Sequence, residues 1–367
     1  MTSYFYDNIG QLVQVKNDGV VTSTYAYDAN GNRLSHTGSG GSSVGTYDVQ
    51  DRMLTYGNST FAYNANGDTT RKVENGQSTN YQYDLFGNLR TVTLPNAGGV
   101  IEYVIDGKNR RIGKKINNVL VQGFLYEDQL KPAAELDGAG NIVSQFIYAT
   151  KTNVPDFMRK DGVNYKIVSD QLGSPLVVIN TSTNEIVQRM DYDEFGNVLE
   201  DTNPGFQPFG FAGGLYDRDT KLVRFGARDY DSESGRWMQK DPIRFDAKDT
   251  NLYGYIFSDP INKIDPSGLY QSPTGPDGGN APVGPGTCDS FYSGKCSNDP
   301  GKYYCEIAPQ LCKNLFPVIP DSDPSNCMRA CLQRKEVGAP KNGSSCDFVS
   351  HEVDIHVECA QACAGTI

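Results

Sequence analysis

Residues 81–89 read Tyr-Gln-Tyr-Asp-Leu-Phe-Gly-Asn-Leu, and related segments recur along the first 199 residues. In each copy, Tyr-x-Tyr is expected to form a strand with both rings on one face, because side chains alternate along a strand. Asp-x-x-Gly is expected to form a turn, in which the carboxylate accepts a backbone hydrogen bond and glycine adopts a positive φ. The copies lie at residues 4–12, 25–34, 47–48, 61–67, 81–89 and 191–199.

The spacing of the copies indicates how they assemble. The turn residues Asp7, Asp28 and Asp48 are 21 and 20 residues apart, which leaves room for about two short strands and two turns per copy. No single copy can bury its aromatic face, so neighbouring copies must stack. We therefore expect a mainly β protein, in which an antiparallel sheet curls into a partly open shell.

The segment Asp28-x-Asn30-x-Asn32 also resembles the start of a calcium-binding loop. Such a loop needs glycine at its sixth position and glutamate at its twelfth. Here Gly31 stands at the fourth position and the twelfth is not glutamate, so we interpret the segment as a plain turn. No metal and no cofactor is expected.

A second, denser pattern occupies residues 224–269. Together with the repeats, it resembles the YD repeats and the core domain of Rhs proteins, a family that includes Tc-toxin C subunits, bacterial wall-associated toxins and animal teneurins. Residues 226–230 depart from the usual Arg-Tyr-Tyr-Asp run of that family. The segments that carry the resemblance are Arg-x-Tyr-Asp-x-x-x-Gly-Arg at 228–236, Lys-Asp-Pro at 240–242, Asn-Leu-Tyr-Gly-Tyr at 251–255 and Asp-Pro-Ser-Gly-Leu at 265–269.

The resemblance implies a domain organisation and a self-cleavage reaction. Family members cut themselves after Asp-Pro-x-Gly-Leu, which here lies between Leu269 and Tyr270. The implied domains are a YD-repeat β-shell at 1–164, an Rhs-associated core domain with the cleavage motif at 165–269, a linker at 270–286 and a variable C-terminal effector domain at 287–367. The linker contains four prolines and five glycines in 17 residues.

The implied active site resembles that of an aspartic protease, with Asp241 and Asp265 as its catalytic pair. Two carboxylates held close together cannot both ionise, so one activates a water while the other, protonated, polarises the scissile carbonyl. Arg236 is a supporting candidate that could stabilise charge or orient the pair. The alternative is that both aspartates are ordinary Asp-Pro turn residues.

All nine cysteines lie in the C-terminal 81 residues. So dense a set predicts a disulfide-rich domain for an oxidising compartment, and an odd number leaves one thiol over. Cys-x3-Cys occurs twice, which favours two short helices because residues i and i+4 share one face. The disulfide candidates are Cys288, Cys296, Cys305, Cys312, Cys327, Cys331, Cys346, Cys359 and Cys363.

The same region holds two weaker chemical alternatives. His351, His356, Cys359 and Cys363 could ligate zinc, but the Cys-x2-Cys knuckle of common zinc sites is absent from the sequence. A hydrolase site could instead be built from His351, Glu352, Asp354 and His356. This run is not the His-Glu-x-x-His motif of zinc proteases.

Charge and termini limit the function further. The net charge is −11 and the pI is about 4.8, so no nucleic-acid partner is expected. No apolar run reaches the ~20 residues of a membrane helix, and the N-terminus lacks signal-peptide features. We expect secretion or delivery by another route, or the C-terminal end of a longer protein.

The resemblance therefore predicts a self-cleaving shell whose C-terminal domain is its cargo and acts as a toxin against competing bacteria or a host. The expected partners are an immunity protein and a secretion-system or toxin-delivery component. The alternative is a non-enzymatic, teneurin-like adhesion module with a disulfide-stapled binding head.

Overall fold

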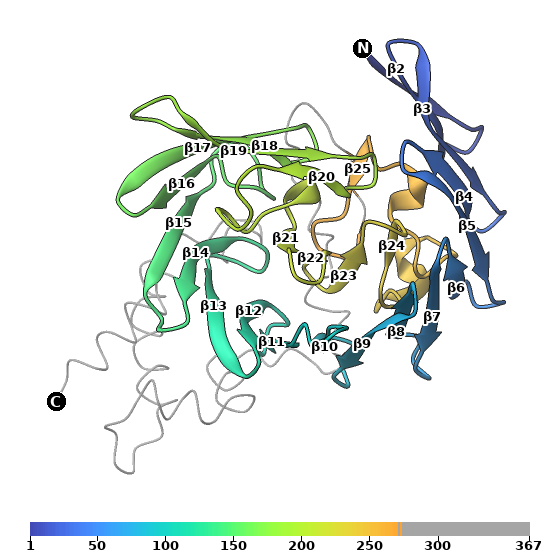
Figure 1. Cartoon of the computed structure of the whole chain (residues 1–367), viewed down its shortest axis with the longest axis horizontal. Helices are drawn as coiled ribbons and strands as arrows, with labels where there is room; N and C mark the ends of the chain where they lie inside the picture. Colours follow the sequence, from blue (N-terminus) through green and yellow to red (C-terminus); the bar gives the residue numbers. More distant parts are fainter. Residues whose placement is uncertain (271, 274–367) are drawn as a thin grey trace, which may run out of the picture. The chain divides into compact units, whose positions relative to one another are not determined.

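The structure is a computed structural model, and it describes residues 1–270 and 272–273. In this part of the chain, one long antiparallel sheet runs through the first 201 residues and each strand pairs with the next (Figure 1). Its strands are β1 (Thr2–Tyr6), β2 (Leu12–Asn17), β3 (Val20–Tyr27), β4 (Arg33–Gly38), β5 (Gly41–Tyr47), β6 (Met53–Tyr56), β7 (Ser59–Tyr63), β8 (Thr69–Glu74), β9 (Gln77–Tyr83), β10 (Leu89–Thr93), β11 (Val100–Ile105), β12 (Arg111–Ile116), β13 (Val119–Tyr126), β14 (Pro132–Asp137), β15 (Ile142–Ile147), β16 (Phe157–Lys160), β17 (Val163–Ser169), β18 (Pro175–Asn180), β19 (Ile186–Tyr192) and β20 (Val198–Asp201).

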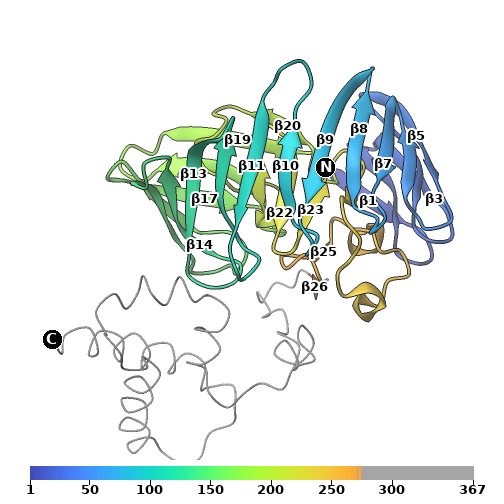
Figure 2. The same cartoon turned by 90° about the horizontal axis from the view of Figure 1, so that it is seen from below.

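The sheet curves around a smaller set of elements, as Figure 1 shows for β21–β24, and Figure 2 shows its strands side by side. β1 and β20 each pair with one neighbour, so backbone pairing leaves the sheet open. The predicted mainly antiparallel β fold is confirmed for the described residues. The inner elements are η1 (Phe211–Gly213), β21 (Leu215–Asp217), β22 (Leu222–Phe225), β23 (Arg228–Asp231), β24 (Arg236–Trp237), η2 (Arg244–Ala247), η3 (Ile256–Ser258), β25 (Lys263–Ile264) and β26 (Ser272–Pro273).

The repeat turns have the chemistry that the sequence predicts. In the turn between β9 and β10, Asp84 Oδ1 accepts hydrogen bonds from the backbone N–H groups of Phe86 at 2.9 Å and Asn88 at 3.0 Å. Gly87 closes the turn with φ +81°. In the next turn Asn109 takes the same place with φ +68°, and asparagine tolerates this conformation better than most residues.

Side chains from distant repeats join the beginning of the long sheet to its end, which backbone pairing leaves apart. The hydroxyl of Tyr25, in β3, donates to Glu194 Oε2 at 2.8 Å, and Glu194 lies in the turn between β19 and β20. The Arg33 guanidinium lies 3.7 Å from the centre of the Phe195 ring. The second and the last copies of the repeat are therefore in direct contact.

Aromatic side chains of the inner elements form a cluster inside the long sheet of β1–β20, which is called the wall below. Phe225, Tyr230, Trp237 and Tyr255 are all buried, and the Tyr230 and Tyr255 ring centres lie 4.4 Å apart. The Trp237 ring lies 5.8 Å from Phe225 and 5.7 Å from Tyr230. Such contacts contribute beyond the apolar area that they bury.

A buried ion-pair network anchors β23 to the wall. Arg111, from β12, contacts Asp229 Oδ1 at 2.6 Å, and Arg224, from β22, contacts Asp229 Oδ2 at 2.9 Å. Burial alone would raise the pKa of Asp229, but the two guanidiniums outweigh it and hold that pKa below its usual value. Asp229 is therefore a buried anion whose charge depends on both arginines.

The C-terminal disulfide-rich domain predicted from the sequence lies outside the described residues. Within those residues, no helix has both the length and the apolar character that crossing a membrane requires.

Gly87→Ala tests the positive-φ turn. A Cβ at Gly87 meets no atom within 4 Å, so the cost should be purely conformational and roughly 1–2 kcal/mol in free energy of unfolding. Urea unfolding followed by the fluorescence of Trp237, the chain's one tryptophan, measures it. Gly107→Ala is the matched control, because Gly107 has no positive φ and equally open space, and it should not destabilise. An equal loss of unfolding free energy in both variants would contradict a conformational cost specific to Gly87.

Asp229→Asn tests the buried network. The substitution leaves two buried guanidiniums without their anion, so the free energy of unfolding should fall by about 3–5 kcal/mol. Asp48→Asn removes a comparable contact at the surface, where Asp48 lies 2.6 Å from Arg52, and should cost at most about 1 kcal/mol. The same urea titration checks both, and similar small effects would show that the network is not an anchor.

Candidate active site

Asp241 is held in a turn just after β24. Its N–H donates to Leu252 O at 2.9 Å, and its Oδ1 accepts the N–H of Ile243 at 2.9 Å. Pro242 has no N–H of its own and favours this abrupt change of direction. The Asp241 side chain is buried, and its other oxygen, Oδ2, is left to face β23.

Asp265 opens the turn that carries the predicted cleavage point. Gly268 N donates to Asp265 O at 3.2 Å, and Gly268 has φ +66°. A Cβ on Gly268 would lie 2.4 Å from the backbone oxygen of Phe225, so no other residue fits there without a shift. The motif therefore needs its glycine for space as well as for conformation.

The Asp265 carboxylate collects the hydrogen-bond donors of this turn. Its Oδ1 accepts the Ser267 hydroxyl at 2.9 Å, and the backbone N–H groups of Leu269 and Tyr270, each at 3.1 Å. The Tyr270 nitrogen belongs to the peptide bond for which the sequence predicts cleavage. A buried carboxyl group is thus in direct contact with the leaving-group nitrogen of that bond.

Arg228, from β23, joins the two aspartates. Its Nη2 lies 2.8 Å from Asp241 Oδ2 and 3.3 Å from Asp265 Oδ2. Its Nε donates to Gly268 O at 2.5 Å, and its guanidinium lies 4.1 Å from the centre of the Trp237 ring. One cation therefore orients both carboxylates and the backbone next to the predicted cleavage point.

Both carboxyl groups bind protons more tightly than free aspartate does. Burial raises the pKa of Asp241 to about 6, with Arg228 opposing the shift and the charge of Asp265 adding a smaller increase. Burial also raises the pKa of Asp265, against Arg228 and the hydrogen bonds from Ser267, Leu269 and Tyr270. Such a pair titrates as a unit.

Arg236 lies at a different place from the one expected for a supporting residue. Its guanidinium donates to Asn32 Oδ1 at 2.6 Å and to the backbone oxygen of Asp51, and it stacks 4.8 Å from the centre of the Tyr47 ring. These three contacts tie β24 to the long sheet, and a further contact of 3.5 Å joins Arg236 to Asn251 Oδ1.

The sequence contained a signal for Arg228 but not a decisive one. Arg228 opens the same core pattern that Arg236 closes, and the pattern does not say which arginine faces the aspartates. Arg228 and Asp229 are neighbours on β23, so their side chains point to opposite faces: one to the aspartate pair and the other to the wall. Ser267 occupies the variable position of the cleavage motif, and nothing in the sequence singles it out.

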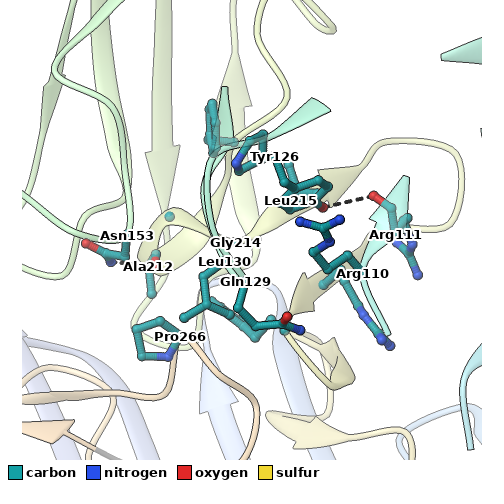
Figure 3. Close-up of a pocket in the computed structure, with 16 residues that line it drawn as sticks. Arg110, Arg111, Tyr126, Gln129, Leu130, Asn153, Ala212, Gly214, Leu215 and Pro266 are labelled. Atoms are coloured by element: carbon teal, nitrogen blue, oxygen red, sulfur yellow. Dashed lines mark hydrogen bonds between the residues drawn. The ribbon is translucent and has the colours of Figure 1, made fainter. Parts of the chain in front are cut away.

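A small cavity lies beside the cleavage turn (Figure 3). It holds about 30 Å³, enough for one or two waters, and Pro266, Arg224 and Arg111 are among its lining residues. Asp241 and Asp265 are not among them, so the carboxylates are packed in protein rather than opening into this cavity.

Of the other binding or catalytic residues predicted from the sequence, some lie within the described residues and some lie outside them. The candidate disulfides, the zinc alternative and the hydrolase cluster of residues 351–356 lie outside the described residues. The calcium alternative lies inside them: Asp28 Oδ1 accepts the N–H groups of Asn30 and Asn32, each at 2.9 Å, and Asp28 Oδ2 accepts the Asn32 side-chain amide at 2.9 Å. These contacts are those of a capped turn.

Comparison with known proteins shows which chains this one is similar to. The Gallus gallus Teneurin-1 is 28% identical over 288 residues, covering 75% of this chain and 10% of that protein. The tRNA nuclease WapA of Bacillus subtilis (strain 168) is 26% identical over 273 residues, covering 72% of this chain and 12% of that protein. The chain thus spans about a tenth of the length of the curated relatives that it matches.

Solved structures share the fold. A crystal structure of TcdB2-TccC3-Cdc42 superposes with a TM-score of 0.58 at 19% identity, over 73% of this chain and 15% of that chain. The sequence pattern described as Teneurin YD-shell matches residues 1–261, which is more than half of the 367 residues. This chain therefore belongs to the Teneurin YD-shell family.

Proposed function

We propose that this protein is a self-cleaving shell, which hydrolyses its own Leu269–Tyr270 bond and releases the following segment as an effector. The observation that carries the proposal is the contact between Asp265 Oδ1 and the Tyr270 nitrogen, at 3.1 Å, inside a buried two-aspartate cluster. Perturbed carboxyl groups at a specific peptide bond are the arrangement that hydrolysis requires.

The two aspartates have separate roles in this mechanism. Asp241, ionised, takes a proton from a water as the water oxygen bonds to the carbonyl carbon of Leu269. Asp265, protonated, supplies a proton to the Tyr270 nitrogen as the carbon–nitrogen bond breaks. The products are a carboxyl group at Leu269 and an amine at Tyr270, and each carboxyl is restored by one proton transfer.

Arg228 is a positioning residue in this mechanism. It contacts both carboxylates and holds the Gly268 carbonyl, which precedes the scissile peptide by one residue. Because the substrate is the chain itself, the effective concentration of the scissile bond is very high, and a single turnover needs no separate binding pocket.

The toxin interpretation of the released segment is supported by relatives and remains part of the proposal. One relative is named a tRNA nuclease, and the fold is shared with TccC3 in complex with TcdB2. We propose that residues 287–367 form the disulfide-rich effector, with residues 351–356 as its candidate hydrolase site. Delivery outside the producing cell, an immunity protein and a delivery component belong to the same proposal.

The teneurin relatives favour a second candidate function. Teneurin-3 of Danio rerio is 30% identical over 278 residues, covering 71% of this chain and 10% of that protein. In this alternative the shell is a rigid, uncut adhesion module. The intact mass of the purified protein distinguishes the two functions, because an adhesion module stays whole.

Asp241→Asn should block self-cleavage. An amide cannot take a proton from water, so the first-order cleavage rate should fall by at least about 100-fold. Denaturing gels and intact mass, before and after reduction, measure the fraction cut and the cleavage point. Asp246→Asn is the control, because Asp246 is exposed in η2. An uncut wild-type chain would overturn the proposed function, and rapid cutting by Asp241→Asn would overturn the role of that residue.

The cleavage rate should depend on pH. Burial raises the pKa of Asp241 to about 6, so the base is mostly protonated at pH 5 and mostly ionised at pH 7. The rate should therefore increase as the pH rises through about 6. Chain isolated uncut in urea and refolded by dilution at each pH gives the rate from the fraction cut against time. A rate that falls steadily from pH 5 to pH 7 would contradict the assignment of Asp241 as a base that becomes ionised through about pH 6.

A further inference from the structure

The Ser267 hydroxyl lies between Asp265 and the peptide bond proposed to break. It donates to Asp265 Oδ1 at 2.9 Å, and its oxygen accepts the Tyr270 N–H at 3.2 Å and the Leu269 N–H at 3.1 Å. The Tyr270 N–H is therefore shared between two oxygens, one from Asp265 and one from Ser267.

The backbone fixes Ser267 in this place from the opposite side. Ser267 O accepts the N–H of Ala227 at 2.8 Å, in the tight turn between β22 and β23. A Cβ on Gly226 would lie 2.2 Å from Ser267 O, so the two chain segments approach as closely as glycine allows. The main chain of Ser267 is thus clamped to the strand pair that carries Arg228.

We propose that Ser267 is a catalytic residue of the cleavage reaction, which relays the proton from Asp265 to the Tyr270 nitrogen. This inference rests on the proposed function. When water adds to the Leu269 carbonyl carbon, the amide nitrogen loses its conjugation and becomes basic. For this step the Ser267 hydroxyl turns its hydrogen away from Asp265, to which it donates in the structure, and toward the nitrogen. The Ser267 oxygen gives that hydrogen to the nitrogen while it receives the hydrogen of the protonated Asp265, so the hydroxyl is restored and Asp265 is left ionised.

The geometry gives a reason for a relay. Asp265 Oδ1 already accepts three hydrogen bonds, and one of them comes from the N–H that must stay on the leaving amine. The N–H is shared between Asp265 and Ser267, so as the nitrogen becomes pyramidal its own hydrogen can stay with Asp265 while the new lone pair faces Ser267. Ser267 Oγ is a second oxygen within 3.2 Å of the same nitrogen and is already bonded to the acid.

The groups that face Asp265 define the pH signature of a relay. They are Arg228 of β23, Asp241 in its turn, Tyr255 before η3 and the Ser267 hydroxyl. The Ser267 hydrogen bond lowers the pKa of Asp265, so its removal raises that pKa. Asp265 would then keep its proton to higher pH, and the falling alkaline limb of the rate profile would move to higher pH.

Ser267→Ala, Ser267→Thr and the matched control Ser234→Ala test the relay. Ser234 also donates to a buried aspartate in a turn, Asp231 at 2.8 Å, but is not bonded to the cleavage segment. The refolding assay should show a rate about 100-fold lower for Ser267→Ala with its alkaline limb moved upward. Ser267→Thr, which keeps a hydroxyl, should restore most of the rate, and Ser234→Ala should match the wild type.

Two outcomes would overturn the relay, provided that Trp237 fluorescence shows the variants to be folded. One is wild-type rate and pH profile in Ser267→Ala. The other is an equal loss in Ser267→Ala, Ser267→Thr and Ser234→Ala, which would reveal a structural effect only. Both differ from failure of the proposed function, in which the wild-type chain itself stays uncut.

Discussion

The contact of Asp229 with Arg111 and Arg224 is the interaction on which the rest of the described structure depends. It joins β12 of the wall to β22 and β23 inside it, through a carboxylate with no access to solvent. The preceding residue of β23, Arg228, points to the other face and holds Asp241 and Asp265. Wall and candidate site are therefore built on the two faces of one four-residue strand, and a shift of that strand would disturb both.

The sequence predicted the local part of this fold well because that part is governed by local chemistry. Alternating aromatic residues predict strands, and Asp-x-x-Gly predicts turns, as the Asp84 hydrogen bonds and the φ of Gly87 illustrate. The contact between Tyr25 and Glu194 was not predictable, because 169 residues separate them and their meeting depends on the summed curvature of the whole sheet.

The sequence likewise predicted only part of the candidate site. The family resemblance named Asp241 and Asp265, and the structure brings them to one cation. The resemblance could not say whether Arg228 or Arg236 contacts the two aspartates. That depends on which face of a short strand each side chain occupies, and a one-residue change in register reverses the faces. The sequence did not point to Ser267, since the role proposed for it comes from a close approach of the chain at Gly226.

The backbone bonds of Gly268 to Arg228 and of Ser267 to Ala227 lie on the shell side of the proposed cut. The proposed cleavage would leave both bonds in place, so the new carboxyl end would stay in the site and block a second substrate. Each chain would then react once, at a rate independent of protein concentration. The cut fraction in a sample would therefore increase with the time since its molecules folded.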